Sequence, residues 1–426
     1  MPPFTAKHSL LSERTFRGSI GQSQISIVNA STEVDVALLT GCQDRHYAFG
    51  LATALASKGV CLEIIGGDQV DSPEFHTTPK LTFLNLRRNQ QQVAPGWVKI
   101  YRLLAYYGRL CRYALTARPK VFHILWNNRV ELIDRTLVMA YYKLLGKKIV
   151  LTAHNVNAAS RDSQDTCLNR ITLRIQYQLA DHIFVHTEKM RRDLLTQFSV
   201  SSHAVTVIPY GINNAVSQTN LTSAAAKQQL GIRGSDRTIL FFGAIAPYKG
   251  LEFLVTAFQQ LIATNVNYRL IIAGKPKKDN EAYFAAIHQA ITRTIGVGRV
   301  IEKIEYIRDE DTERYFKAAD VLVLPYSRIF QSGILFLAYS FGLPVIATDV
   351  GAFRDDVIEA KTGYLCRPCD PADLAQIIDK YFESQLFNAL DRRRPEIRDY
   401  MTARHSWDVV AEMTRNVYEQ LQGSWQ

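Results

Sequence analysis

The sequence predicts an α/β protein with two doubly wound parallel sheets, one in each half of the chain. Its 426 residues exceed what one hydrophobic core usually organises and suit two domains. Short, almost uninterrupted apolar segments alternate with longer stretches of helical spacing. Such strands are typical of parallel sheets that helices cover on both faces. A polar stretch at residues 213–235 interrupts the alternation, which restarts at residue 237.

In the first half, six apolar segments are expected to form strands. Helical stretches include residues 97–117 and 130–145. The predicted strands are VDVALLTG (34–41), VCLEIIGGD, KVFHILW (120–126), KKIVLTAH (147–154), DHIFVHT (181–187) and AVTVIP (204–209).

The second half repeats the pattern with six further strands. Helices are expected from Lys249 onward and near 280–294, 309–318 and 332–341, and a break near Pro395 interrupts the last helical residues. The predicted strands are RTILFFG (237–243), YRLIIAG (268–274), RVIEKIEYI (299–307), DVLVLPY (320–326), PVIAT (344–348) and TGYLCRP (362–368).

These elements predict five parts along the chain. The polar first residues, which lack an apolar signal-peptide core, are expected to form a flexible tail. Two Rossmann-like domains and a linker follow, and a C-terminal helix packs back on the first domain. The predicted boundaries are 1–30 for the tail, 31–212 for the first domain, 213–235 for the linker, 236–395 for the second domain and 396–426 for the helix.

Composition limits the classes of partner and location. No apolar window is long enough for a transmembrane helix, and the six cysteines are scattered, so we expect a reduced, cytoplasmic protein. Residues 1–210 carry 25 Lys and Arg against 15 Asp and Glu, whereas residues 211–426 carry 25 of each. The excess of +10 therefore lies in the first half, which either faces an anionic partner or merely has a basic surface. Neither a metal-binding set of His and carboxylate residues nor a nucleic-acid recognition motif is evident.

Glycine-containing turns follow three predicted strands of the second half. Glycine lets backbone N–H groups approach a phosphate closely, a helix N-terminus adds partial positive charge, and a nearby lysine adds a charged contact. These turns together indicate a ligand that carries a diphosphate. The residues expected to bind it are Gly243, Lys249, Gly274, Lys275, Gln331, Ser332, Gly333 and Ile334.

Polar residues follow the predicted strands of the first half. His154 comes directly after an apolar strand and next to Asn155, so it is the preferred residue for binding a sugar hydroxyl or moving a proton. A structural role for any such histidine stays open. The residues expected on the acceptor side are Asp44, Arg45, His46, Asn127, Asn128 and Asn155.

Several segments resemble the family 4 glycosyltransferases, over about residues 34 to 385. FFGAIAPYKGLEFLVTAF, YRLIIAG, AADVLVLPY and FGLPVIATDVG resemble the donor half of that family, and LTAHNV, ADHIFVHTEKM and VIPYG resemble its acceptor half. The resemblance implies the GT-B fold, with two facing Rossmann-like domains, and metal-independent transfer of a sugar from a nucleotide-sugar. It also implies that Lys249 and Gly333 bind the diphosphate and that His154 faces the donor sugar.

The donor-site motif is atypical at three positions. The family usually has an arginine where this chain has Ala244, and two glutamates, for the donor sugar and the ribose, where it has Ile329 and Leu337. Loss of a charge-assisted pair to the ribose would cost on the order of 1.5–3 kcal/mol. We expect Gln331 and Ser332 to replace the first glutamate and Lys275 to offset the missing arginine.

The segment GWVKIYRLLAYYGRLCRYALTARPK, residues 96–120, has helical spacing. One face carries Ile100, Leu103, Leu104, Tyr107, Leu110, Cys111 and Ala114, and the other carries Lys99, Arg102, Tyr106, Arg109 and Tyr113. The basic face suits an anionic membrane surface or a polyprenyl-linked pyrophosphate, and the alternative is an ordinary surface helix.

Together these features predict a hexosyltransferase-type enzyme, cytoplasmic or peripheral on the inner face of the membrane. Its substrates would be a UDP- or GDP-linked sugar and a glycan or lipid-linked acceptor in polysaccharide biosynthesis, with no further cofactor and no nucleic acid. Two alternatives stay open: a non-catalytic GT-B binding subunit, and a sugar-nucleotide epimerase on the same fold.

Overall fold

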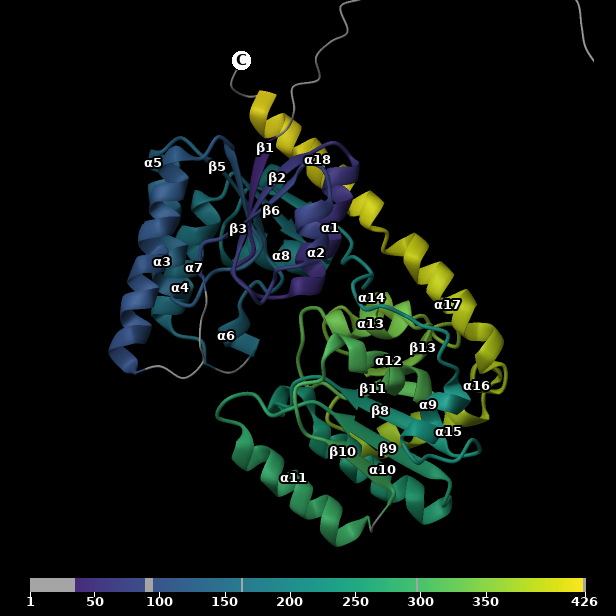
Figure 1. The fold of residues 1–426 in the computed structure, drawn as a ribbon. Helices are drawn as coiled ribbons and strands as arrows, with labels where there is room; N and C mark the ends of the chain where they lie inside the picture. Colours follow the sequence, from purple (N-terminus) through teal and green to yellow (C-terminus); the bar gives the residue numbers. More distant parts are fainter. Residues whose placement is uncertain (1–34, 89–94, 162–163, 296–297, 424–426) are drawn as a thin grey trace, which may run out of the picture. The chain divides into compact units, whose positions relative to one another are not determined.

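The computed structural model of the chain describes residues 35–88, 95–161, 164–295 and 298–423. The predicted N-terminal tail at residues 1–30 lies outside these residues. The described residues form one compact unit, which contains two parallel sheets. The predicted α/β class with two doubly wound sheets is therefore confirmed (Figure 1).

The first sheet has seven parallel strands in the order β3-β2-β1-β4-β5-β6-β7. Its strands form because runs of Val, Ile, Leu and Phe bury both faces, and Val36 and Leu38, for example, have no exposed surface. The strands are β1 (Asp35–Leu39), β2 (Cys61–Gly66), β3 (Leu81–Asn85), β4 (Val121–Ile124), β5 (Lys148–Thr152), β6 (His182–Val185) and β7 (Val205–Val207).

Helices cover this sheet on both faces. Asp44 starts the first of them by accepting a hydrogen bond from the Tyr47 backbone N–H, as an N-cap residue does. The helices are α1 (Arg45–Ser57), α2 (Pro73–Thr77), α3 (Gly96–Thr116), α4 (Glu131–Ile133), the π-helix η1 (Asp134–Val138), α5 (Met139–Leu144), α6 (Ala158–Arg161), α7 (Cys167–Leu179), α8 (Glu188–Gln197) and the 3₁₀ turn η2 (Ser202–Ala204).

The second sheet has six parallel strands in the order β10-β9-β8-β11-β12-β13. The strand order reverses between β8 and β11, as it does between β1 and β4 in the first sheet, and ligands bind at such switch points. The strands are β8 (Arg237–Phe242), β9 (Tyr268–Ala273), β10 (Val300–Lys303), β11 (Val321–Leu324), β12 (Val345–Thr348) and β13 (Gly363–Cys366).

The predicted linker at residues 213–235 contains a short helix, α9 (Ser223–Gln229). Lys227 on α9 is buried, pairs with Asp320 at 2.9 Å and donates to the Asp236 carbonyl, which fixes α9 on the second lobe. The remaining helices of this lobe are the 3₁₀ turn η3 (Pro247–Lys249), α10 (Leu251–Thr264), α11 (Glu281–Thr294), α12 (Asp309–Ala318), α13 (Gly333–Ser340), α14 (Phe353–Asp356), α15 (Pro371–Glu383) and α16 (Gln385–Asn388).

The chain ends with α17 (Leu390–Arg404) and α18 (Trp407–Gly423), drawn in yellow in Figure 1. The break predicted near Pro395 is wrong, because α17 continues through this residue. Arg394 fixes that part of α17 by donating to the carbonyls of Phe316, Ala319 and Phe341. The helical direction changes only after Arg404, and α18 then packs against α1 and β4, where Tyr418 contacts His123 at 2.6 Å.

The predicted faces of α3 are also wrong in part. Ile100 and Leu104, expected on the covered side, are 61% and 66% exposed, whereas Tyr106 from the predicted basic side is buried. The reason is that only the second half of α3 packs on the sheet, through Tyr106, Leu110 and Ala114. Among the described residues, no helix is both long and apolar enough to cross a bilayer.

Candidate functional site

A cavity of about 430 Å³ lies between the carboxyl ends of the two sheets. Pockets of this size at strand switch points commonly hold small ligands. Its walls come from the β1–α1 loop, the segment after β7, the ends of β8 and β9, the loop after β10, the N-terminus of α13 and the start of α18.

Two glycines form the part of the wall at the ends of β8 and β9. Gly243 has φ +100° and Gly274 has φ +147°, in the region that side chains disfavour. A Cβ on Gly274 would lie 1.9 Å from the Gly243 carbonyl oxygen, so the two strand ends pack backbone to backbone. The N–H groups of both glycines are used within the sheet, because Gly243 donates to the Ala273 carbonyl and Gly274 to the Lys303 carbonyl, each at 2.9 Å. The glycines therefore offer a ligand close approach to the strand ends and not their own N–H groups.

Two lysines place positive charge near these glycines. Lys275 lines the cavity directly. Lys249 is 7% exposed and does not line the cavity, but its Nζ lies 3.3 Å from the position that a Cβ on Gly243 would take. The Lys249 ammonium also lies over the Tyr326 ring, at 5.2 Å. Lys249 therefore stands immediately behind the glycine wall.

The N-terminus of α13 contributes Gly333 and Ile334 to the cavity, whereas Gln331 and Ser332 do not line it. The Gln331 side-chain amide donates to Asp356 at 3.1 Å, and Ser332 is buried. The replacement of a family glutamate by Gln331 and Ser332 thus lacks direct geometric support.

The three atypical positions differ in their placement. Ala244 and Leu337 both line the cavity, so an arginine or a glutamate there would face the ligand. Ile329 instead packs against the core, and its carbonyl oxygen lies 2.1 Å from where a Cβ on Gly351 would be. The cavity wall is therefore apolar where the family usually has charge.

On the side of the first sheet, Asp44 and His46 line the cavity. Asp44 accepts a hydrogen bond from the Tyr210 hydroxyl at 3.1 Å. His46 contacts Asp309, a residue of the second lobe, at 3.0 Å. Burial alone would lower the pKa of His46, but the hydrogen bond to Asp309 and its charge outweigh burial and raise that pKa above its usual value.

His154 lies behind this wall, stacked on Trp126 at 4.2 Å and edge-on to Tyr47 at 4.6 Å. Burial, and then the neighbouring His186, hold the pKa of His154 well below its usual range, so the ring is neutral. Burial also lowers the pKa of His186, to about 4. The Nδ1 atom of His186 lies 3.3 Å from the Ile208 carbonyl oxygen, and its Nε2 atom lies 3.0 Å from Nδ1 of His154.

A carbonyl can only accept, which fixes the protons of this histidine pair. His186 donates from Nδ1 to Ile208, so its Nε2 accepts from His154 Nδ1–H. His154 Nε2 then carries a lone pair, and it has no hydrogen-bond partner in the described part of the chain. His154 is thus oriented as a hydrogen-bond acceptor.

The other residues expected on the acceptor side lie outside the cavity lining. Arg45 forms an ion pair with Asp309 at 3.7 Å, and Asn155 is half-buried. Asn127 exchanges hydrogen bonds with Gln176, and Asn128 accepts from Tyr106 while donating to Asp134. These amides are occupied by structural partners.

Several cavity residues were missed from the sequence, among them Glu305, Tyr306 and Trp407. Glu305 and Tyr306 follow β10, which ends at Lys303. They were missed because the strand was expected to run to residue 307, so the rule that binding sites lie at strand ends was not applied to them. Trp407 comes from α18, and its indole N–H donates to the Ile212 carbonyl at 2.7 Å. No local pattern linked the last helix to the cavity. Among the residues with described positions, no group of three His, Cys, Asp or Glu side chains is placed to hold a metal ion.

Two family models match most of the chain. Residues 45–216 match the model described as Glycosyltransferase Family 4, and residues 236–384 match the model described as Glycosyl transferases group 1. The two matches cover the first and second lobes separately.

Relatives and solved structures agree with these matches. A D-inositol 3-phosphate glycosyltransferase of Corynebacterium aurimucosum is 24% identical over 67% of this chain and 72% of its own length, and one of Streptomyces avermitilis is 26% identical over 56% and 52%. Sucrose-phosphate synthase of Thermosynechococcus elongatus superposes with a TM-score of 0.74 at 19% identity, over 92% of this chain and 99% of that one. HepE of Anabaena in complex with UDP superposes with a TM-score of 0.68 at 17% identity, over 91% and 100%.

Proposed function

Because this chain belongs to the family 4 glycosyltransferases and has their GT-B fold, we propose that it transfers a hexose from a UDP- or GDP-linked donor to a glycan or lipid-linked acceptor. The observation that carries this proposal is the cavity between the sheets, with the Gly243–Gly274 wall and Lys249 behind it. HepE, of the same fold, binds UDP, and the named relatives act on a phosphorylated inositol.

In this proposal the second lobe holds the nucleotide diphosphate. The glycines at the ends of β8 and β9 let the phosphates approach closely, the N-terminus of α13 adds partial positive charge, and Lys249 and Lys275 supply full charges. Glu305, which lines the cavity, provides a carboxylate for the ribose hydroxyls that Leu337 cannot bind.

The first lobe then holds the reacting sugar and the acceptor. His154 Nε2 is buried behind Tyr47 and Trp126, so it accepts a hydrogen bond from a donor-sugar hydroxyl once these side chains shift as the donor binds. Asp44 and His46 contact the acceptor. The bond from the sugar to the diphosphate breaks as the acceptor hydroxyl bonds to the sugar. Positioning of the reactants and neutralisation of the leaving diphosphate supply most of the acceleration, without a metal.

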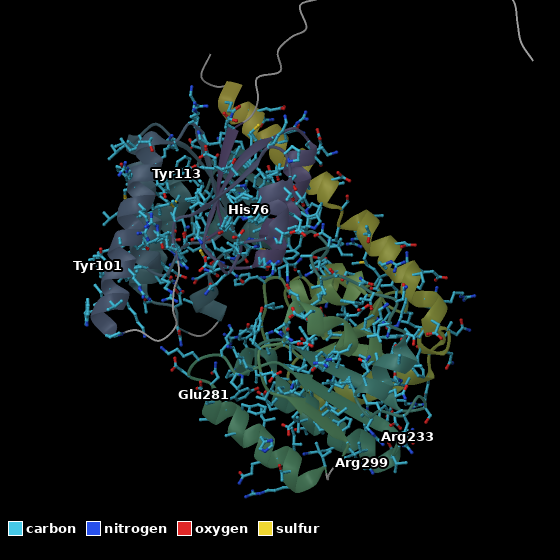
Figure 2. All side chains as sticks on the ribbon, viewed as in Figure 1. His76, Tyr101, Tyr113, Arg233, Glu281 and Arg299 are labelled. Carbon is cyan, nitrogen blue, oxygen red and sulfur yellow. The ribbon has the colours of Figure 1, made fainter. Side chains whose placement is uncertain are left out.

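We also propose that α3 brings the enzyme to the inner face of a membrane during polysaccharide biosynthesis. Its first turns expose Trp97, Ile100, Tyr101 and Leu104 by 73%, 61%, 68% and 66%, at spacings that place them on one side of the helix. Figure 2 shows Tyr101 on the side of α3 that faces away from the sheet. Aromatic and aliphatic side chains flanked by lysine and arginine suit a bilayer interface.

The test is a thermal-shift screen with UDP-, GDP- and ADP-sugars, followed by an assay of nucleoside diphosphate release. A ligand that binds only the folded chain raises the unfolding midpoint by mass action. We expect UDP- or GDP-sugars to do so, and release to require an acceptor. Binding without release under any acceptor would identify a non-catalytic binding protein instead.

A further inference from the structure

A second cavity, of about 450 Å³, opens in the first lobe. It lies at the carboxyl ends of β1 to β4, where loops meet the side of α3. Five cationic side chains line it: Arg87, Arg88, Lys99, Arg102 and Arg129. Among the described residues of its lining, Asp68 is the single carboxylate, so the cavity carries a strong positive charge.

The cationic side chains come from three separate elements and converge on one space. Arg87 lies over the Tyr106 ring at 5.1 Å, and the Tyr106 hydroxyl is held by Asn128 at 2.6 Å. Within the described ranges, no ion pair joins Arg87, Arg88, Lys99 or Arg129 to a carboxylate. Five cationic side chains share this cavity with one carboxylate, Asp68, and their mutual repulsion favours an anionic ligand.

The backbone around the cavity is strained at two non-glycine residues. Cys42 has φ +57° and Arg88 has φ +56°, both in the left-handed region. A Cβ on Gly67 would lie 2.9 Å from Arg87 Cβ and 3.3 Å from Cys42 Sγ, so these loops approach one another closely. These close approaches fix the loops that carry Arg87 and Arg88 against the β1–α1 loop, so the cavity has a defined wall.

This basic cavity adjoins the cavity between the sheets. Cys42 lines the basic cavity and Asp44 lines the cavity between the sheets, and these two residues are two positions apart on the β1–α1 loop. Their Cα atoms are therefore at most about 7.6 Å apart. The β1–α1 loop thus borders both cavities, which places a ligand of the basic cavity on the side of the first lobe that faces the cavity between the sheets.

We propose that the basic cavity binds a phosphoryl group of the acceptor, a phosphate ester or a diphosphate, and presents the adjoining hydroxyl to the donor sugar. That the bound molecule is the acceptor rests on the proposed function, whereas binding of a phosphoryl group in the basic cavity does not depend on that function. Arginine guanidinium groups form paired hydrogen bonds with phosphate oxygens, and Lys99 adds a point charge at the mouth.

The test is a calorimetric titration of the full chain with inorganic pyrophosphate and phosphate, run with and without UDP or GDP, so that the nucleotide displaces any pyrophosphate bound in the cavity between the sheets. In the variant Arg102→Gln/Arg129→Gln we expect pyrophosphate to bind at least ~10-fold more weakly. The matched control is Arg112→Gln/Arg118→Gln, which removes the same charge from exposed positions at the other end of α3 and beyond it. The control should keep wild-type affinity, and all three proteins should share one unfolding midpoint.

The same proteins are then titrated with UDP and GDP. Nucleotide affinity should be unchanged in both double variants, so a failure of nucleotide binding would count against the proposed function and not against the basic cavity. No pyrophosphate binding by the wild-type chain, or equal weakening in both double variants, would overturn the inference.

A further arm distinguishes the source of the phosphoryl group. Vesicles of phosphatidylcholine with phosphatidic acid are compared with pure phosphatidylcholine vesicles, with and without pyrophosphate. Retention that pyrophosphate displaces, and that Arg102→Gln/Arg129→Gln abolishes, indicates a lipid phosphate. Pyrophosphate binding without such retention indicates a soluble phosphorylated acceptor.

Discussion

The imidazole Nε2 of His46 lies 3.0 Å from both carboxylate oxygens of Asp309. His46 is on α1 of the first lobe and Asp309 starts α12 of the second, so this ion pair bridges the lobes at the wall of the cavity. The hydrogen bond from His46, acting against burial, lowers the pKa of Asp309. The pair thus couples protonation to the contact between the lobes.

We predict that Asp309→Asn lowers the unfolding temperature more at about pH 6 than at about pH 8. The folded pKa of His46 is raised, so the stabilisation by this pair is fully present below the unfolded pKa of about 6.5 and is lost as pH rises through the raised value. Thermal unfolding followed across this range measures the difference. Glu310→Gln, one residue further on α12, is the control, and an Asp309→Asn effect independent of pH would contradict the prediction.

A second prediction concerns the glycine wall. Gly274→Ala would place a Cβ 1.9 Å from the Gly243 carbonyl at a disfavoured φ, so we expect a loss of at least about 2 kcal/mol of stability. Gly234→Ala, at an exposed site with no atom near the new Cβ, is the matched control. Denaturant titration measures both, and equal stability of the two variants would show that the strand ends can separate without cost.

Glu305 supplies a third prediction. If its carboxylate binds the ribose, Glu305→Gln should weaken nucleoside diphosphate binding ~10-fold, because a charge-assisted hydrogen bond is worth about 1.5–3 kcal/mol. Glu310→Gln removes a carboxylate that pairs with Arg308 and does not line the cavity, so its affinity should match the wild type. Unchanged affinity of the Glu305 variant would remove Glu305 from the nucleotide site.

Asp356 gives a fourth prediction, on stability alone. Burial raises the pKa of Asp356 to about 7, although the Gln331 hydrogen bond opposes this. For a carboxyl group with a raised folded pKa, the native state binds the extra proton, so its stability contribution falls as pH rises from about 4 to about 7. Asp356→Asn should therefore remove a decrease in the free energy of unfolding, on the order of a few kcal/mol, that the wild type shows as pH rises through this range. Denaturant titrations at several pH values measure the slope, and parallel curves for variant and wild type would argue against a neutral Asp356.

The sequence predicted every strand of the two sheets except β3, because buried parallel strands read as apolar runs. The edge strand β3 was missed because it is only partly buried and its sequence, LTFLN, contains polar residues. The sequence also pointed to Gly243, Gly274, Lys275 and Gly333, which line the cavity because the glycine turns lie at strand ends, where parallel sheets bind ligands. Asp44 and His46 follow the same rule at the end of β1. At these residues the end of an apolar run in the sequence is also the strand end that borders the cavity.

The remaining site residues depend on contacts between distant segments. The position of His154 behind Tyr47, and the cavity contact of Trp407, arise from packing that joins the last helix to the first lobe. Helical periodicity could not show that only the second half of α3 packs on the sheet, so that the first turns of the helix leave Ile100 exposed. Pro395 was expected to end a helix because local sequence does not reveal the carbonyl groups that hold Arg394.

The most direct measurement is a calorimetric titration of the full chain with UDP, GDP and ADP, repeated with Lys249→Met. We expect one nucleoside diphosphate to bind with a stoichiometry of about one, and its affinity to fall ~10- to 100-fold in the variant, since the ammonium behind Gly243 would no longer balance the phosphates. Absence of heat with every nucleoside diphosphate, or identical affinity without the Lys249 amine, would contradict a diphosphate site in this cavity.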